Sequence, residues 1–470
     1  MLTKSRRQFL ASAGRGFGAV AASSLLPSLA GAASPLAPKA AHQPARAKAV
    51  IYLYMHGGVS HVDTWDPKPE LARFSGQTLP PSFVKGLKTS RIDFTKAIAR
   101  GSAWPFRRHG QAGLEISDLF PHIASHADEL ALVRSCYGDA FDHAPAMYLS
   151  GTGSQFPGRP CLGSWVVYGL GSENQNLPAF VVMTDGAMKC GPQGYGAGFL
   201  PAVYQGTMFR GGRSPVLDLA NPEGTSNATQ SATLDLIGDL DRQHLAERPF
   251  DSDLEARLAS YELAFRMQSE APDAVDISKE SEATKKLYGI GEPLSDDFGR
   301  KCLLARRLVE RGVRFIQLYS GTHLGDDWDG AHNDLTGSHN KMAGKTDKPI
   351  AGLLKDLAAR GLTDSTLVIW GSEFGRTPLA EGRNGRDHHP YAFSMWFTGA
   401  GVKGGQVIGA TDDFGLRPVE KPMMAHDVNA TILRMMGLDH LRLTYFYQGR
   451  DMRLTDVHGD NEFTQLLVRA

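Results

Sequence analysis

Short runs of apolar residues, four to seven residues long, recur along the chain and end at polar or glycine-rich segments. Continuous apolar runs of this length, rich in β-branched and aromatic residues, are typical of strands that are buried on both faces of a parallel sheet. We therefore predict strands at Ala49–Met55, Phe180–Met183, Val313–Tyr319, Thr366–Trp370 and Phe393–Phe397. The first run stops abruptly at His56-Gly57-Gly58, where glycines allow a tight turn and a close approach to a ligand.

Apolar residues at helical spacing lie between and after these runs. They predict helices over Leu254–Met267, Phe298–Glu310, Ile350–Arg360 and Asp427–Met436. Gly361 follows the third of these helices directly and suits a helix C-cap. Because strands and helices alternate, we predict an α/β sandwich with a mainly parallel sheet. In such folds the active site lies beyond the carboxyl ends of the strands.

Two long stretches, residues 65–115 and 185–250, carry many glycine, proline and polar residues. We predict that they are loop insertions over the sheet, placed where they would cover the site. Residues 33–48 are rich in alanine, proline and lysine and predict a disordered leader. Residues 49–470 are then expected to form one domain with these insertions.

The N-terminus has the three parts of a twin-arginine signal peptide, which we predict over residues 1–32. Arg6-Arg7 precede Phe9-Leu10, a weakly apolar run follows, and Ala30-Gly31-Ala32 offer small residues at the cleavage position. A short amphipathic anchor or a chance arginine pair is the alternative interpretation. The signal predicts that the twin-arginine translocase exports the folded chain, which then acts in the periplasm or as a secreted protein.

Charge, hydropathy and cysteine content exclude several classes of protein. The chain has 50 basic and 50 acidic residues, so nothing indicates a nucleic-acid partner, which needs a clustered positive face. No stretch after the signal reaches the ~18–20 apolar residues of a stable membrane span. Four cysteines, Cys136, Cys161, Cys190 and Cys302, are too few for a disulfide scaffold and form no CxxC zinc motif. One disulfide is possible outside the cytoplasm, and its pairing stays open.

Histidine and carboxylate residues gather in four segments beside the predicted strands. These segments are residues 56–66, 326–334, 372–377 and 386–390. Imidazole and carboxylate are the preferred ligands of zinc and similar divalent metals. Each segment alone would be an ordinary loop hydrogen-bond pair or a surface salt bridge. Together, at one edge of one sheet, they predict a metal site, because burying that many charges without a metal or a partner is costly.

Arg376 lies three residues after Glu373, and two roles for it stay open. It would either neutralise that carboxylate or bind a phosphate-like or sulfate-like oxyanion through two hydrogen bonds.

Several segments resemble the exported family called domain of unknown function 1501. They are Gly57–Lys68, Ser260–Gln268, Ser372–Pro378, Gly385–His388 and Val402–Asp412. The likeness covers nearly everything after residue 48, and the family is similar to the alkaline phosphatase and sulfatase superfamily. The resemblance implies a three-layer α/β/α sandwich of the alkaline phosphatase type. It also implies a one- or two-metal site that cleaves phosphate or sulfate esters.

The resemblance assigns one metal site clearly. Asp329 and His332 are similar to an Asp–His ligand pair of the superfamily, and His388 is similar to the remaining histidine of that site. These three residues would hold the better-formed metal site. His426 lies in a segment that resembles a structural helix and is not expected to be a ligand.

A second metal site would be weaker. The segment Thr366–Gly375 resembles a sulfatase strand, which puts Glu373 where a metal-binding aspartate stands. Phe374 takes the place of a metal-binding histidine and cannot bind metal. After the first strand His56 stands where an aspartate ligand is usual, with Asp63 further on. His56, Asp63 and Glu373 would therefore form this second site or orient the first.

The position of the superfamily's nucleophile holds no hydroxyl or thiol. The helix that it should open is similar to Phe141–Gly151, and the expected serine, threonine or cysteine is replaced by Phe141 or Asp142. His143 would instead be a ligand or a general base near neutral pH.

These residues lead to two hypotheses. The first is an exported hydrolase of a phosphate or sulfate ester that uses metal-activated water, with His143 and Arg376 as catalytic residues. Its cofactor would be zinc, calcium or magnesium, and its substrate a small anionic ester or a sulfated or phosphorylated glycan. The alternative is a non-catalytic metal- or glycan-binding exported protein that lost the nucleophile. An accessory role in the cell envelope is a third possibility that no residue favours or opposes.

Overall fold

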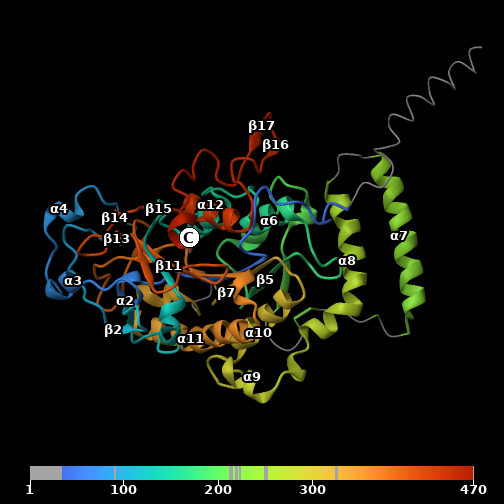
Figure 1. The fold of residues 1–470 in the computed structure, drawn as a ribbon. Coiled ribbons are helices and arrows are strands. Elements are labelled where there is room, and N and C mark those ends of the chain that lie inside the picture. Colours follow the sequence, from blue (N-terminus) through green and yellow to red (C-terminus); the bar gives the residue numbers. More distant parts are fainter. Residues whose placement is uncertain are drawn as a thin grey trace, which may run out of the picture.

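A mixed sheet forms the centre of the computed structural model, which describes residues 34–88, 91–210, 215–216, 221, 224–247, 252–322 and 326–468. Within these residues the sheet has nine strands in the order β12-β4-β11-β8-β1-β7-β5-β6, and β15 pairs with β4 (Figure 1). Their bounds are β1 Ala49–Met55, β4 Ala131–Tyr137, β5 Phe180–Thr184, β6 Thr207–Arg210, β7 Phe315–Ser320, β8 Thr366–Gly371, β11 Phe393–Thr398, β12 Gln406–Ile408 and β15 Met423–Met424.

The strands beside β1 are parallel to it. Strand β1 lies between β7 and β8, with Tyr54 level with Tyr319 on one side and Gly371 on the other. Strands β5 and β6 continue the parallel arrangement beyond β7. Strand β11 is antiparallel to both of its neighbours, β8 and β4. The α/β fold with a mainly parallel sheet is therefore confirmed, and each of the five predicted strands is present.

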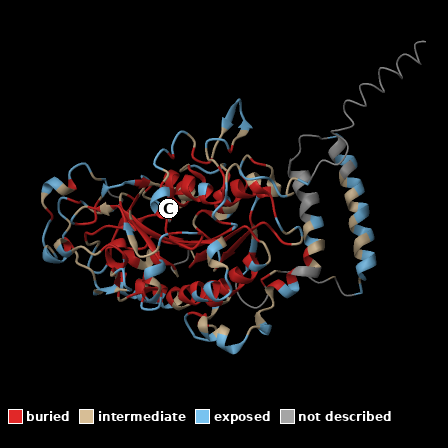
Figure 2. Cartoon of the chain, viewed as in Figure 1, coloured by how far each residue is buried: buried red, intermediate tan, exposed pale blue. Residues whose placement is uncertain are grey.

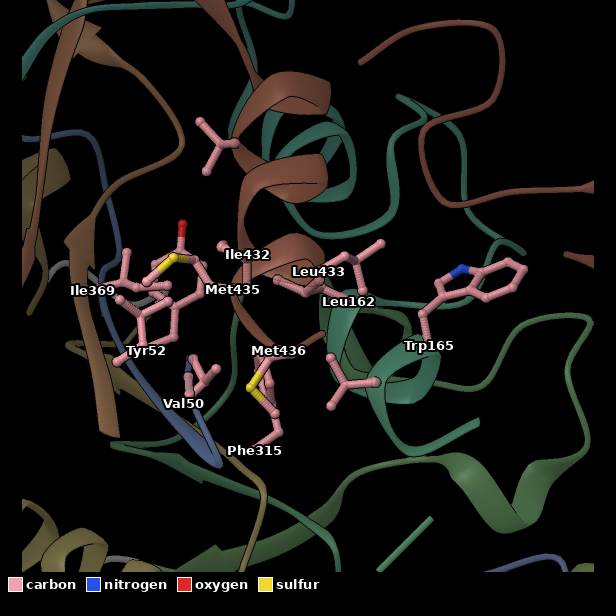
Figure 3. Close-up of a cluster of buried hydrophobic side chains, with 14 of the residues drawn as sticks. Val50, Tyr52, Leu162, Trp165, Phe315, Ile369, Ile432, Leu433, Met435 and Met436 are labelled. Carbon is pink, nitrogen blue, oxygen red and sulfur yellow. The ribbon is translucent and has the colours of Figure 1, made fainter. Parts of the chain in front are cut away.

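Helices cover both faces of the sheet and give three layers. Val50 and Tyr52 of β1 point to one face and belong to a buried cluster with residues of α5, α6 and α12 (Figure 3). Ile51 and Leu53 point to the other face and belong to a second cluster with residues of α10 and α11. These helices are α5 His143–Thr152, α6 Leu162–Leu170, α10 Asp296–Glu310, α11 Leu335–Ala359 and α12 Ala425–Met435. Figure 2 shows the buried residues concentrated in the sheet and on the inner sides of these helices.

Smaller elements surround this core. Four two-stranded ribbons are described: β2 Phe106–His109 with β3 Leu114–Ser117, β9 Gly375–Arg376 with β10 His388–His389, β13 Ala410–Thr411 with β14 Pro418–Glu420, and β16 Tyr445–Tyr447 with β17 Arg450–Met452. The remaining α-helices are α2 His61–Thr64, α3 Pro69–Arg73, α4 Pro81–Val84, α7 Asn227–Glu247, α8 Ser252–Val275, α9 Glu282–Leu287 and α13 Thr464–Leu467.

Two of the differences between the structure and the sequence prediction lie in residues 185–250 and 34–48. The stretch 185–250, predicted as loop, contains α7, because its alanine, leucine, glutamine and glutamate residues favour helix despite the polar composition. Helix α7 lies outermost in Figure 1, alongside α8. Residues 34–48, predicted as a disordered leader, run along the domain instead. Lys39 N donates to Leu170 O, and both Arg46 N and Ala47 N donate to Met435 O.

The described residues bear on the remaining N-terminal and membrane expectations only in part. The predicted signal peptide, residues 1–32, lies outside them. Among the residues that the structure describes, no helix combines the length and apolar character needed to cross a membrane. All four cysteines are buried and free.

Candidate metal centre

The centre lies beyond the carboxyl ends of β1, β7 and β8, the edge that the sequence predicted. The chain turns after β1 at Gly57, which has a φ of 113° that favours glycine. A Cβ at this position would lie 2.5 Å from the backbone nitrogen of Asp329. Trp328 N also donates to His56 O at 3.1 Å. The turn after β1 is therefore pressed directly against the 3-10 helix Trp328–His332, which carries Asp329.

One oxygen of Asp329 is the meeting point of three imidazole rings. Oδ1 lies 2.9 Å from His143 Nε2, 3.1 Å from His388 Nε2 and 3.3 Å from His332 Nε2. His332 Nε2 and His388 Nε2 are themselves only 2.8 Å apart. Asp329 and His332 come from the same 3-10 helix, His143 opens α5, and His388 belongs to β10. Side chains from three distant parts of the sequence thus point at one atom.

The second nitrogen of each ring is held by an oxygen acceptor. These acceptors are Glu373 Oε1 for His143 at 2.6 Å, the carbonyl oxygen of Phe141 for His388 at 2.7 Å, and Glu381 Oε2 for His332. Since an N–H must donate to each acceptor, Nδ1 carries the proton and Nε2 of a neutral ring keeps its lone pair. Metal-binding histidines show this same arrangement, in which the outer partner fixes the ring and its tautomer.

The charges of the cluster favour a bound cation. Burial lowers the pKa of His388 to about 3 despite Asp329, so this ring is neutral near pH 7. Burial also lowers the pKa of His143, but Asp329 and Glu373 outweigh that effect and raise it above the ordinary value. For Asp329 burial raises the pKa, but the three neighbouring histidines and the Arg376 guanidinium bring it well below the usual range. The Nε2 lone pair of the neutral His388 ring therefore lies 3.1 Å from an ionised carboxylate oxygen, and a cation that binds both atoms would remove their repulsion.

The donor set fits a divalent metal. One ligand atom each from His143, Asp329 and His388 lie within 4.8 Å of one another, and the same holds for His332, Asp387 and His388. Bonds of ~2.0–2.1 Å to a tetrahedral zinc ion place neighbouring ligand atoms about 3.3 Å apart. The distances from Asp329 Oδ1 to the three Nε2 atoms, from 2.9 to 3.3 Å, are close to that value. Nitrogen and oxygen donors of this kind suit zinc.

The predicted ligands Asp329, His332 and His388 therefore come together, and His143 joins them. Glu373 stands behind His143 as its hydrogen-bond partner and also accepts from Gly57 N at 2.9 Å. Burial raises the pKa of Glu373, but His143 outweighs it and lowers the pKa to about 2. Glu373 thus fixes the His143 ring, the contact that its expected role of orienting the first site would need.

His56 lies near the cluster, with its ring centroid 6.4 Å from that of His143. Its Nδ1 is 3.9 Å from Asp327 Oδ2, and neither ring nitrogen has a hydrogen-bond partner among the described residues. Burial lowers the pKa of His56 to about 4, so the ring is neutral near pH 7. Burial raises the pKa of Asp327 above its ordinary value, although the Lys189 ammonium acts to lower it.

Asp63, expected as a ligand of the second site, is engaged elsewhere. Its carboxylate accepts from Arg386 Nε at 2.7 Å and from Ser60 Oγ at 2.5 Å, and it also accepts from Ala103 N at 3.3 Å. The side chains of Asp63 and Arg386 are both 0% exposed. Asp63 therefore balances a buried guanidinium and contributes nothing to the cluster around Asp329.

Arg376 does not pair with Glu373. Its guanidinium is 0% exposed and donates to the carbonyl oxygens of Gly57, Gly58 and Arg386, and to Asp329 Oδ1 at 2.7 Å. Because these contacts occupy most of its N–H groups, Arg376 holds the turn after β1 in place. It is poorly placed to bind a substrate oxyanion.

Sequence reasoning missed a partly exposed cation of the centre, Lys189. Its Nζ donates to Asp329 Oδ2 at 2.6 Å and lies 3.4 Å from Asp327 Oδ2, and its side chain is 17% exposed. Lys189 lies in the loop after β5, and such loops at the carboxyl ends of strands are where a site is expected. Within this glycine-rich loop, however, a single lysine gives no signal of its own. Glu381, which accepts from His332, was also missed, because it stands alone in the sequence outside the four segments rich in histidine and carboxylate residues.

Helix α5 begins without a nucleophile, as the sequence indicated. Asp142 is its N-cap and His143 its first residue. Phe374 packs its ring against His143 and His388, with ring centroids 4.8 and 4.6 Å away. It forms an apolar wall of the site.

These features define a three-layer α/β/α protein with a histidine–carboxylate centre at the strand ends, similar in structure to members of the alkaline phosphatase and sulfatase superfamily. The chain belongs to the family described as "Protein of unknown function (DUF1501)", which matches residues 47–465. No curated protein matches the chain significantly.

Three solved structures illustrate the similarity. The alkaline phosphatase from the Antarctic bacterium TAB5 is 10% identical, with a TM-score of 0.37, and the match covers 84% of this chain and 100% of that one. The PsFucS1 sulfatase from Pseudoalteromonas sp. is 14% identical, with a TM-score of 0.37 and coverage of 88% and 72%. The lipoteichoic acid synthase LtaP from Listeria monocytogenes is 8% identical, with a TM-score of 0.39 and coverage of 89% and 78%. At these TM-scores they assign no residue role in this chain.

Proposed function

We propose that this protein is an exported, metal-dependent hydrolase of a phosphate or sulfate ester that uses an activated water. The observation that carries the proposal is the convergence of three imidazole Nε2 atoms on Asp329 Oδ1, with each ring fixed through its Nδ1. Arg6-Arg7 and the segment after them support export by the twin-arginine route.

His143, Asp329, His332 and His388 would hold the metal. A divalent cation in such a site supplies a water with a pKa near ~7 and an electrophilic contact for the ester oxygen. The first residues of α5 offer no hydroxyl, and the Ser372 hydroxyl is buried and donates to Met55 O at 2.7 Å. Attack by water needs neither group, which is why we favour it over a covalent intermediate.

Lys189 takes over the role first considered for Arg376. Its ammonium is partly exposed, whereas Arg376 is fully buried. An ammonium has three N–H donors, and the hydrogen bond to Asp329 uses one of them. Another can donate to an anionic ester and stabilise the charge that develops on its oxygen.

Replacing the shared carboxylate tests the proposal. We expect Asp329→Ala to bind zinc at least about 100-fold more weakly, beyond the loss typical of an outer partner, and to lose hydrolysis of 4-nitrophenyl phosphate or sulfate. Asp326→Ala is the matched control, since Asp326 pairs with Lys341 and Lys345 away from the imidazoles. It should keep the metal and the activity of the unaltered protein.

Two results would count against the hydrolase. Full metal content in Asp329→Ala would remove the proposed centre. Stoichiometric metal in the unaltered protein without turnover of either aryl ester would contradict catalysis and favour the non-catalytic metal-binding alternative.

A further inference from the structure

The second oxygen of Asp329 faces a different group from the first. While Oδ1 faces the imidazoles, Oδ2 accepts from Lys189 Nζ at 2.6 Å. The same Nζ lies 3.4 Å from Asp327 Oδ2. Asp329 thus links two neighbouring charge clusters, one around the histidines and one around the ammonium.

The second cluster has donor atoms without partners. Asp327 Oδ2 and both ring nitrogens of His56 are buried and have no hydrogen-bond partner among the described residues. His56 Nδ1 lies 3.9 Å from Asp327 Oδ2. Buried polar atoms of this kind cost free energy unless a partner satisfies them. Two carboxylates and an imidazole also make a ligand set suited to a divalent cation.

Carboxylates that serve two ions at once are a feature of centres in which the metals lie about 3.5–4 Å apart. Asp329 has the bridging position that such a centre needs, but the cation at its Oδ2 is an ammonium. Lys189 is held there by its own loop: the carbonyl of the buried Cys190 accepts from Tyr148 Oη at 3.0 Å.

We propose that the Lys189 ammonium takes the position of a second cation and thereby limits the centre to one metal ion. This inference rests on the proposed function, because it presupposes a metal at the histidine cluster. It adds a specific role for one side chain: Lys189 neutralises Asp327 and the outer oxygen of Asp329 and blocks the approach of another ion.

Metal counting tests the inference without any substrate. The purified full chain and its variants are stripped with a chelator, titrated with Zn²⁺ by calorimetry, and analysed for bound zinc after gel filtration. We expect one ion per chain for the unaltered protein and for Lys189→Arg, which keeps the charge. Lys189→Met removes the charge and should bind two ions per chain, because Asp327, Asp329 Oδ2 and His56 become available.

Three further variants make the result specific. Lys189→Gln repeats the loss of charge with a polar side chain, in case Lys189→Met does not fold by circular dichroism. The double variant Lys189→Met with His56→Ala should return to one ion. Lys345→Met is the matched control, since Lys345 is similarly exposed at 19% and pairs with the adjacent Asp326. It should stay at one ion.

The outcomes separate the two proposals. One ion in the unaltered protein together with one ion in Lys189→Met and Lys189→Gln would overturn the role of Lys189 and leave the metal centre intact. Two ions in the unaltered protein would overturn it as well. No ion in the unaltered protein would overturn the proposed function itself.

Discussion

Replacing Asp63 by alanine distinguishes a metal ligand from the partner of a buried cation. Its carboxylate accepts two hydrogen bonds from Arg386, and both side chains are 0% exposed. Alanine would leave the guanidinium buried without its counter-charge and would also remove the acceptor of Ser60 Oγ and Ala103 N. The expected effect is therefore a loss of stability, with the metal retained.

The size of the effect follows from the burial of both partners. Breaking a buried ion pair by removing one partner costs about 3–5 kcal/mol. An unfolding entropy of ~2.1 cal/mol/K per residue, over the 47–465 span of the family match, corresponds to roughly 0.9 kcal/mol/K. The melting temperature should therefore fall by about 3–6 °C.

Thermal unfolding followed by circular dichroism, together with zinc analysis of the same samples, measures both quantities. Glu70→Ala is the control, because Glu70 forms an exposed pair with Arg73 that is worth only ~0–1 kcal/mol. If Asp63→Ala instead lost its zinc and melted like the unaltered protein, Asp63 would be a ligand and the structural reasoning would be refuted.

Two other predictions concern the metal directly. Glu381→Gln should bind zinc about 10–100-fold more weakly because His332 loses the carboxylate that orients it, and an affinity unchanged in competition with a chromogenic chelator would contradict that role. Removing the metal with a chelator should lower the melting temperature by about 3 °C if zinc had been present at 100 times its Kd, which stabilises by about 2.7 kcal/mol, and adding zinc back should restore it. Identical melting curves with and without chelator would contradict a metal that binds the folded state.

The sequence predicted the central strands well because their environment leaves a simple pattern. Strands β1, β7 and β8 are buried on both faces, so their residues are almost all apolar. Strand β4 was missed because Arg134 and Ser135 interrupt its apolar run. Helix α7 was missed because its composition is polar and gives little hydrophobic periodicity.

Two signals in the sequence could identify residues of the candidate site: a position near the end of a predicted strand and a side chain that can bind a metal. Asp329, His332 and His388 show both signals, and they lie together in the structure. Asp63 has the right chemistry, but its partner Arg386 comes 323 residues later, and only the folded chain reveals the pair. Lys189 is not a metal ligand by type, so no ligand pattern includes it. The signal peptide and export stay predictions from the N-terminal residues.

The contact at Gly57 has a consequence for how this centre can vary. The backbone of Trp328 and Asp329 leaves no room for a Cβ at position 57, so the turn and the 3-10 helix are in direct backbone contact there. No side chain at this position can adjust if one of the two segments changes. A chimera that swaps one of the two segments between relatives would have to swap the other as well. Recombination experiments on this fold should therefore treat them as a single cassette, although some 270 positions separate them along the chain.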